Sequence, residues 1–200
     1  MLKYDISPNV KGLIFDLDGT LVNTMPYHFE AWQKTAEQFG MEITKEFMRD
    51  NMGSSARVIA HKFLKMHGKE NEVEVDELLA TKFENFKTLI SKLTPIQEVF
   101  DIAKHYHGKI PMAIGTGGSK KSVAMTLEQT GVGKYFDVLI CAEDVDNHKP
   151  APDTFLQCAE KIGVNPEYCE VFEDGELGLQ AAKNAGMIAT DVRPWYDPTW

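Results

Sequence analysis

The sequence predicts an α/β fold, in which a parallel β-sheet has helices on both faces and a group of helices inserted into it. Short apolar runs alternate with segments of helix length along the second half of the chain, as in βαβ units. A similar run lies near the N-terminus, and no convincing strand follows it until residue 110. The predicted strands are Leu13–Leu17, Ile110–Ile114, Val138–Cys141, Glu170–Phe172 and Met187–Val192.

The interval between the first two predicted strands has the apolar periodicity of helices. Pro26 begins the first helix and Gly40 ends it. Thr94 and Pro95 are predicted as the N-cap and first residue of a later helix that runs to Tyr106. We therefore expect an α/β core domain formed by residues 1–24 and 92–200, and an inserted α-helical domain formed by residues 25–91. The remaining helices of that insert are predicted over Thr44–Asn51, Ala56–His67 and Val75–Ile90.

The composition of the chain indicates which classes of binding partner and which cellular compartment to expect. The chain of 200 residues is 43% hydrophobic and carries a net charge of −9, which argues against nucleic acid or an anionic membrane as the main partner. The three cysteines, Cys141, Cys158 and Cys169, lie in apolar surroundings, so we expect buried free thiols and a reducing compartment. Because no segment has the pattern of a signal peptide or a membrane span, we expect a cytoplasmic protein, and its size suits a monomer.

Acidic pairs follow two of the predicted strands. Asp16 and Asp18 stand at the end of the first strand, where Gly19 permits a sharp turn, and Glu173 and Asp174 follow the fourth. Each pair alone is more simply explained as a solvated turn. Because open α/β sheets bind ligands at the carboxyl ends of their strands, we expect both pairs at one site. Two carboxylate clusters form a hard oxygen site that suits Mg²⁺.

The other two strand ends carry groups suited to an anion. Thr116 and Gly117 lie in the run Gly115–Ser119, where a strand leads into a helix and backbone N–H groups can cradle a phosphate. Lys149 shortly precedes a helix predicted from Asp153, a position that favours a neighbouring anion. A plain turn and an exposed lysine are the alternatives for each feature alone. Together with the acidic pairs, these strand ends predict a site for phosphate and metal.

These residues resemble, in order and spacing, the motifs of the haloacid dehalogenase superfamily of aspartate-nucleophile phosphotransferases. The run Phe15–Thr20 resembles the first motif, Thr116 the second, Lys149 the third, and Glu173 with Asp174 the fourth. The helical insert resembles the small α-helical cap of the β-phosphoglucomutase-like branch. Several stretches are more similar to the fructose-1-phosphate and 6-phosphogluconate phosphatases of that branch. The resemblance implies a Rossmann-like core with an inserted cap.

The resemblance also implies an activity, namely a Mg²⁺-dependent phosphatase that hydrolyses small phosphorylated metabolites, such as sugar phosphates, through an aspartyl-phosphate. Asp16 is the implied nucleophile, and Asp18 the general acid and base. Thr116, the N–H groups after it, including that of Gly117, and Lys149 are implied to hold the phosphoryl group.

Further site residues follow from the same resemblance. The implied Mg²⁺ ligands are the Asp16 side chain, the Asp18 backbone carbonyl and Asp174, with Glu173 bound directly or through water. The cap residues expected to face the substrate are His28, Arg57 and Lys82.

Several alternatives stay open from the sequence. A β-phosphoglucomutase-type enzyme shares nearly all of these parts and passes the phosphoryl group to a second sugar hydroxyl rather than to water. A receiver domain or a non-catalytic metal-binding relative would be a binding module instead of an enzyme. A receiver carries its acid pair on a separate strand and has no helical insert, so this class is disfavoured. Haloalkanoate dehalogenation is also disfavoured, because Asp18, Lys149 and the Glu173–Asp174 pair together indicate phosphate and metal.

Overall fold

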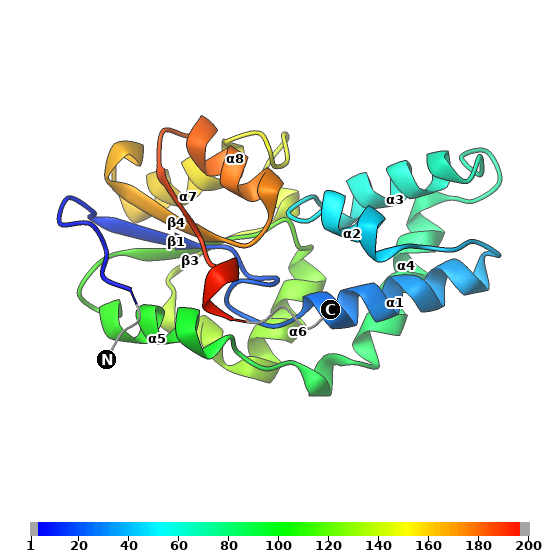
Figure 1. Cartoon of the computed structure of the whole chain (residues 1–200), viewed down its shortest axis with the longest axis horizontal. Coiled ribbons are helices and arrows are strands. Elements are labelled where there is room, and N and C mark those ends of the chain that lie inside the picture. Colours follow the sequence, from blue (N-terminus) through cyan, green and yellow to red (C-terminus); the bar gives the residue numbers. More distant parts are fainter. Residues whose placement is uncertain (1–3, 197–200) are drawn as a thin grey trace.

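The central strand of the sheet is β1 (Gly12–Phe15), all of whose residues are buried. The computed structural model describes residues 4–196. The strands run parallel in the order β3-β2-β1-β4-β5 (Figure 1). The order changes direction at β1, and such a point is where open α/β sheets bind their ligands. The other strands are β2 (Met112–Gly115), β3 (Val138–Ile140), β4 (Cys169–Glu173) and β5 (Ile188–Asp191).

Helices cover both faces of this sheet, as the continuous apolar strands require. Leu13 and Phe15 of β1 pack in one core with α5 (Gln97–Tyr106) and α6 (Lys120–Thr130). Ile14 points to the opposite face and packs with α7 (Asp153–Ile162) and α8 (Glu176–Asn184). Figure 1 shows these two pairs of helices on opposite sides of the strands. Short 3₁₀ turns lie at Ile90–Lys92, Val132–Tyr135, Ala142–Asp144, Pro166–Tyr168 and Arg193–Trp195.

Four helices between β1 and α5 form a separate group beside the sheet (Figure 1). They pack around an apolar cluster that includes Trp32 and Phe63. The segments that connect these helices to the sheet pair with each other. The Asn23 N–H donates to the Thr94 carbonyl over 2.9 Å, and the Ile96 N–H donates to the Leu21 carbonyl over 2.9 Å. The helices are α1 (Met25–Gln38), α2 (Lys45–Asp50), α3 (Ala56–Met66) and α4 (Val75–Lys87).

The predicted α/β class, the parallel sheet and the helical insertion are confirmed, while several element ends differ. The first strand stops at Phe15, and the Leu17 carbonyl then accepts N–H groups from the following turn. The cap predicted at Thr94 and Pro95 is wrong, because Pro95 pairs with Val22 and α5 begins only at Gln97.

The structure also bears on the cysteines and on membrane-spanning helices. All three cysteines are buried and unbridged, as predicted. Within residues 4–196, no helix has the length and apolar character needed to cross a membrane.

Candidate active site

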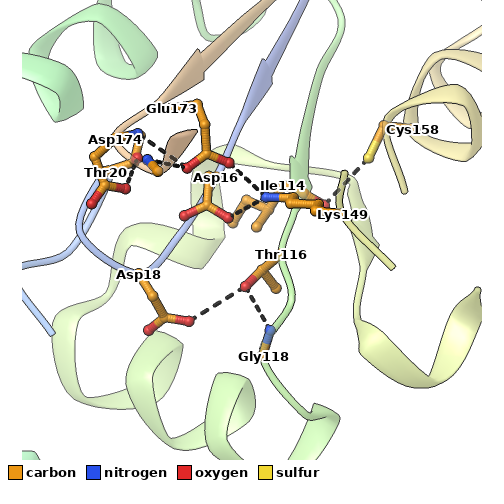
Figure 2. Close-up of polar contacts among 11 residues, drawn as sticks. Asp16, Asp18, Thr20, Ile114, Thr116, Gly118, Lys149, Cys158, Glu173 and Asp174 are labelled. Atoms are coloured by element: carbon orange, nitrogen blue, oxygen red, sulfur yellow. Dashed lines mark hydrogen bonds and ion pairs between the residues drawn. The ribbon is translucent and has the colours of Figure 1, made fainter. Parts of the chain in front are cut away.

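The carboxyl ends of β1 and β4 bring Asp16 and Glu173 together around Lys149 (Figure 2). The Lys149 ammonium donates to Asp16 Oδ1 and to Glu173 Oε2, each over 2.7 Å. All three residues are buried, and the side chain of Lys149 is only 1% exposed. Although burial acts to lower it, the pKa of Lys149 is raised by these two carboxylates. The predicted anionic partner of Lys149 is therefore a pair of buried carboxylates.

Asp174 completes a buried acidic cluster with Asp16 and Glu173. One carboxylate oxygen from each residue lies within 4.8 Å of the others. Burial and the charge of Glu173 raise the pKa values of Asp16 and Asp174 well above the ordinary range. The raised values reflect three carboxylates that face a single lysine within the cluster, an excess of negative charge that favours a bound cation.

The hydrogen bonds in the cluster divide its oxygens into occupied and available ones. Glu173 Oε1 accepts the N–H groups of Asp174 and Gly175, and its other oxygen accepts from Lys149. Asp174 Oδ1 accepts the Thr20 hydroxyl over 2.8 Å, whereas its Oδ2 has no hydrogen-bond partner within the described part of the chain. A buried carboxylate oxygen in this state is costly unless a cation binds it. The donor set is all oxygen and therefore fits Mg²⁺.

Gly19 makes the close approach of the β1 loop to this cluster possible. Its φ is +90°, a left-handed conformation that glycine adopts without strain. A Cβ atom at this position would lie 2.2 Å from Asp174 Oδ2. Any larger residue would therefore displace the carboxylate that carries the unpartnered oxygen.

Asp18 and Thr116 lie beside the acidic cluster, and the Asp18 side chain points away from it (Figure 2). The Thr116 hydroxyl donates to Asp18 Oδ2 over 3.4 Å and accepts the Gly118 N–H over 2.9 Å. Thr116 thus lies between a carboxylate and the N–H groups at the end of β2. The metal contact expected for the Asp18 backbone carbonyl stays a prediction.

Two of the predicted residues from the inserted helices, His28 and Lys82, reach Asp18. Lys82 Nζ lies 2.9 Å from His28 Nδ1, and His28 Nε2 lies 3.1 Å from Asp18 Oδ1. A protonated Lys82 must donate to Nδ1, so we assign the imidazole proton to Nε2, which donates to Asp18. Burial lowers the pKa of Lys82 to about 8, and burial together with Lys82 lowers the pKa of His28. Burial would raise the pKa of Asp18, but the hydrogen bond from His28 and the charge of Lys82 outweigh it and lower that pKa.

Arg57 is not brought into this group, contrary to the expectation from the sequence. Its guanidinium pairs with Asp76, and its side chain is 56% exposed. It lines a separate hollow beside α3 and α4, whereas the preceding residue, Ala56, lines the cavity that contains Asp16. Adjacent residues of a helix point about 100° apart, so the two side chains face different surfaces.

Two further residues in contact with the site were not assigned a role from the sequence. Thr20 lies in the run Phe15–Thr20, directly after Gly19, and its hydroxyl could have indicated a hydrogen bond within the site. In the structure this hydroxyl donates to Asp174. The hydroxyl of Tyr196 donates to the Gly19 carbonyl across 177 residues of sequence. Burial and the nearby acidic residues, beginning with Asp174, raise the pKa of Tyr196, so its hydroxyl keeps its proton. No local pattern around Tyr196 indicates this contact.

Comparison with known proteins agrees with the geometry. A family described as haloacid dehalogenase-like hydrolase matches residues 13–192. The chain belongs to this family. Among its relatives, this haloacid dehalogenase-like hydrolase is 38% identical to fructose-1-phosphate phosphatase YqaB of Escherichia coli, over 91% of this chain and 96% of that one. It is 32% identical to β-phosphoglucomutase of Bacillus subtilis, over 92% of this chain and 83% of that one.

A solved structure shares the arrangement as well. A β-phosphoglucomutase from Clostridium difficile matches this haloacid dehalogenase-like hydrolase with a TM-score of 0.80 and 28% identity, over 91% of this chain and 84% of that one. The resemblance to the superfamily and to its β-phosphoglucomutase-like branch is thereby confirmed. The hydrolase family and the phosphatase names among its relatives support the hydrolysis of phosphoric monoesters as the reaction class. The chain is accordingly an enzyme rather than a receiver domain.

Proposed function

We propose that this enzyme is a Mg²⁺-dependent phosphatase of small phosphorylated sugars and that it works through an aspartyl-phosphate on Asp16. The observation that carries the proposal is the buried arrangement of Asp16, Glu173 and Asp174 around Lys149. A carboxylate attacks a phosphate ester only where the charges of both groups are balanced, and this cluster combines an ammonium group with oxygens that suit a divalent cation.

The residues of the cluster fit the metal in different ways. Asp16 and Asp174 would bind Mg²⁺ directly, since Asp174 Oδ2 is buried without a described partner. The Asp18 carbonyl would be a further ligand, and Glu173, whose oxygens already accept three hydrogen bonds, would act from the next layer. Bound Mg²⁺ would offset the negative charge of the phosphoryl oxygens that face Asp16.

Lys149 would orient Asp16 and reduce the repulsion between its carboxylate and the incoming phosphate. The Lys149 ammonium binds Asp16 Oδ1, which leaves Oδ2 as the oxygen for attack on phosphorus. Thr116 and the N–H group of Gly117 would hold the phosphoryl group during transfer. When the Asp16–phosphorus bond forms, the bond from phosphorus to the sugar oxygen breaks, and the sugar oxygen then requires a proton.

Asp18 would supply that proton and later remove one from the attacking water. Its lowered pKa keeps it ionised in the free enzyme, where His28 binds Oδ1. A phosphate placed beside it would raise its pKa again, because a like charge disfavours ionisation. Oδ2, near the Thr116 hydroxyl, is then the oxygen that carries the proton. This exchange of roles is general acid catalysis followed by general base catalysis.

The inserted helices would act as a cap that covers the substrate and excludes bulk water. His28 and Lys82 link this cap to Asp18, so the catalytic carboxylate is bonded correctly only when the cap lies against the core. We propose that the boundaries between the core domain and the cap lie between residues 24 and 25 and between residues 91 and 92. Arg57 is left out of the proposed substrate site because it faces another hollow.

Asp16→Asn tests the proposal with fructose 1-phosphate as the probe substrate. The wild-type enzyme should release phosphate with Mg²⁺ and stop when EDTA is added, whereas Asp16→Asn should keep its circular dichroism spectrum and lose turnover. Asp101→Asn, which changes an exposed aspartate on α5, serves as the matched control and should keep wild-type activity. Wild-type turnover by Asp16→Asn would falsify the assignment of the nucleophile.

A further inference from the structure

We propose that the substrate carries a single phosphate, and that compounds with a second phosphate on the leaving group are rejected by the cap wall of the cavity. The cap wall is the part of the cavity lining contributed by the inserted helices and by the loop between α2 and α3. This inference rests on the proposed phosphatase function and adds the class of leaving group. The apolar residues of the cap wall are Met25, Trp32, Met48, Met52, Ala56 and Ile59.

The amide on the cap wall offers an anion at most one N–H group, because its other N–H and its oxygen already form hydrogen bonds. Asn51 Nδ2 donates to the Phe47 carbonyl over 2.7 Å, and its Oδ1 accepts from Lys62 over 2.7 Å. Ser54 adds a hydroxyl, which carries no charge. A second phosphate placed here would lose its water and meet methionine and tryptophan side chains instead of cations, which is strongly unfavourable for a dianion.

The basic side chains of the cavity lining belong to a hydrogen-bonded chain that ends on Asp18. Among residues 4–196, the lining contains the Lys82 ammonium, which donates to His28, and the neutral His28 imidazole, which donates to the Asp18 carboxylate. If a second phosphate took Lys82 from this chain, His28 would lose the donor that fixes its tautomer. Binding a bisphosphate by this route would therefore weaken the group proposed to transfer the proton.

Other basic residues near the cavity lie outside its lining, and of these Lys62 contacts the lining through its bond to Asn51 Oδ1. Arg57 binds Asp76 outside the lining, and Lys120 binds Asp144 over 2.6 Å. The Lys121 ammonium lies 3.8 Å from the centre of the Phe83 ring. On the core side, the lining beyond Thr116 consists of Gly117, Gly118, Ser119 and Ser122, which offer N–H groups and hydroxyls.

The same wall bears on the mutase alternative. In a phosphosugar mutase, the Asp16–phosphorus bond would break as a hydroxyl of a sugar phosphate bonds to phosphorus, and the hydroxyl proton would pass to Asp18. The product of that step is a sugar bisphosphate, whose other phosphate must lie against the cap wall. Lys82 is the one lysine or arginine of the lining among the described residues, and it is hydrogen-bonded to His28 beside Asp18 rather than placed among the apolar side chains of the wall, so water is the favoured acceptor.

Paired substrates test the inference directly. With Mg²⁺ in excess and ionic strength held constant, we expect kcat/KM for fructose 1,6-bisphosphate to be on the order of a hundredfold below that for fructose 1-phosphate. With β-glucose 1-phosphate and glucose 1,6-bisphosphate together, we expect free phosphate and no glucose 6-phosphate. Equal kcat/KM values for the fructose pair, or formation of glucose 6-phosphate, would overturn the inference while leaving aspartyl-phosphate chemistry intact. No turnover of any sugar monophosphate would overturn the proposed function as well.

Ala56→Arg tests the cause of the discrimination, with Ala56→Gln as the neutral control. Ala56 begins α3 and lines the cap wall, so an arginine there adds the missing positive charge. Ala56→Arg should reduce the preference for the monophosphate at least severalfold, and Ala56→Gln should not. An equal change of the ratio in both variants would contradict the role given to charge, and the wild-type comparison stands even if either variant folds poorly.

Discussion

Replacing Lys149 with methionine keeps a side chain of similar length but removes the ammonium group between Asp16 and Glu173. Both ion pairs are 2.7 Å long and almost fully buried, so solvent does little to screen the charges that remain. Loss of one partner from a buried ion pair typically costs about 3–5 kcal/mol. For a chain of 200 residues, such a loss corresponds to a fall in Tm of roughly 6–20 °C.

The stability loss of Lys149→Met should depend on pH with a defined sign. Asp16 and Asp174 have pKa values raised by burial and by Glu173, and removing Lys149 raises them further. A carboxyl whose pKa is higher in the folded state binds more protons when folded, so stability falls as pH rises through the folded-state pKa. The variant should therefore lose more stability at about pH 8 than at about pH 5.

Denaturant unfolding in the presence of EDTA measures this effect without bound metal. Lys120→Met is the matched control, because Lys120 also forms a close ion pair, with Asp144, but its side chain is 60% exposed. We expect only a small change for Lys120→Met, since exposed ion pairs contribute little. If Lys149→Met and Lys120→Met lose equal free energy of unfolding at about pH 8, the proposed charge balance of the cluster is refuted.

Three further predictions concern groups around the cluster. Asp174→Asn should stabilise the metal-free protein, because it removes a buried charge. It should also reduce the rise in Tm that Mg²⁺ produces in calorimetry. An undiminished rise would exclude Asp174 as a Mg²⁺ ligand. In the wild-type enzyme, kcat/KM should fall as pH rises through about 8, where Lys82 loses its proton. Lys82→Gln should abolish this fall, whereas Lys87→Gln, at the exposed end of the same helix, should retain it. Loss of the fall in both variants would contradict this assignment. The Tyr196 hydroxyl donates a hydrogen bond to the Gly19 carbonyl. Tyr196→Phe should therefore lose about 1 kcal/mol of stability and bind Mg²⁺ more weakly in a calorimetric titration. An unchanged Mg²⁺ affinity would show that Tyr196 has a structural role alone.

Much of the core site was predictable because a parallel sheet places the carboxyl ends of its strands at one edge. Asp16 and Glu173 are far apart in sequence, yet each directly follows or ends a buried apolar run. Once the runs were recognised as parallel strands, their neighbouring acids had to converge. The structure brings Lys149 to the same place, between the two carboxylates.

The sequence was less informative where contacts depend on direction or on distant segments. Ala56 and Arg57 are adjacent at the start of α3, and only the orientation of that helix decides which one faces the cavity. Pro95 has the local pattern of a helix start, but pairing with Val22 outweighs it. Tyr196 reaches Gly19 through tertiary packing that no local periodicity encodes.

The central claim is that Asp16 becomes phosphorylated, and chemical trapping tests it most directly. The enzyme is mixed with fructose 1-phosphate and Mg²⁺, quenched during turnover and treated with borohydride, which reduces an aspartyl-phosphate to homoserine. Peptide mass spectrometry should then find homoserine at position 16 in samples that received substrate and aspartate there in samples that did not. A phosphorylated or reduced residue at any other position, with Asp16 unchanged, would contradict the account.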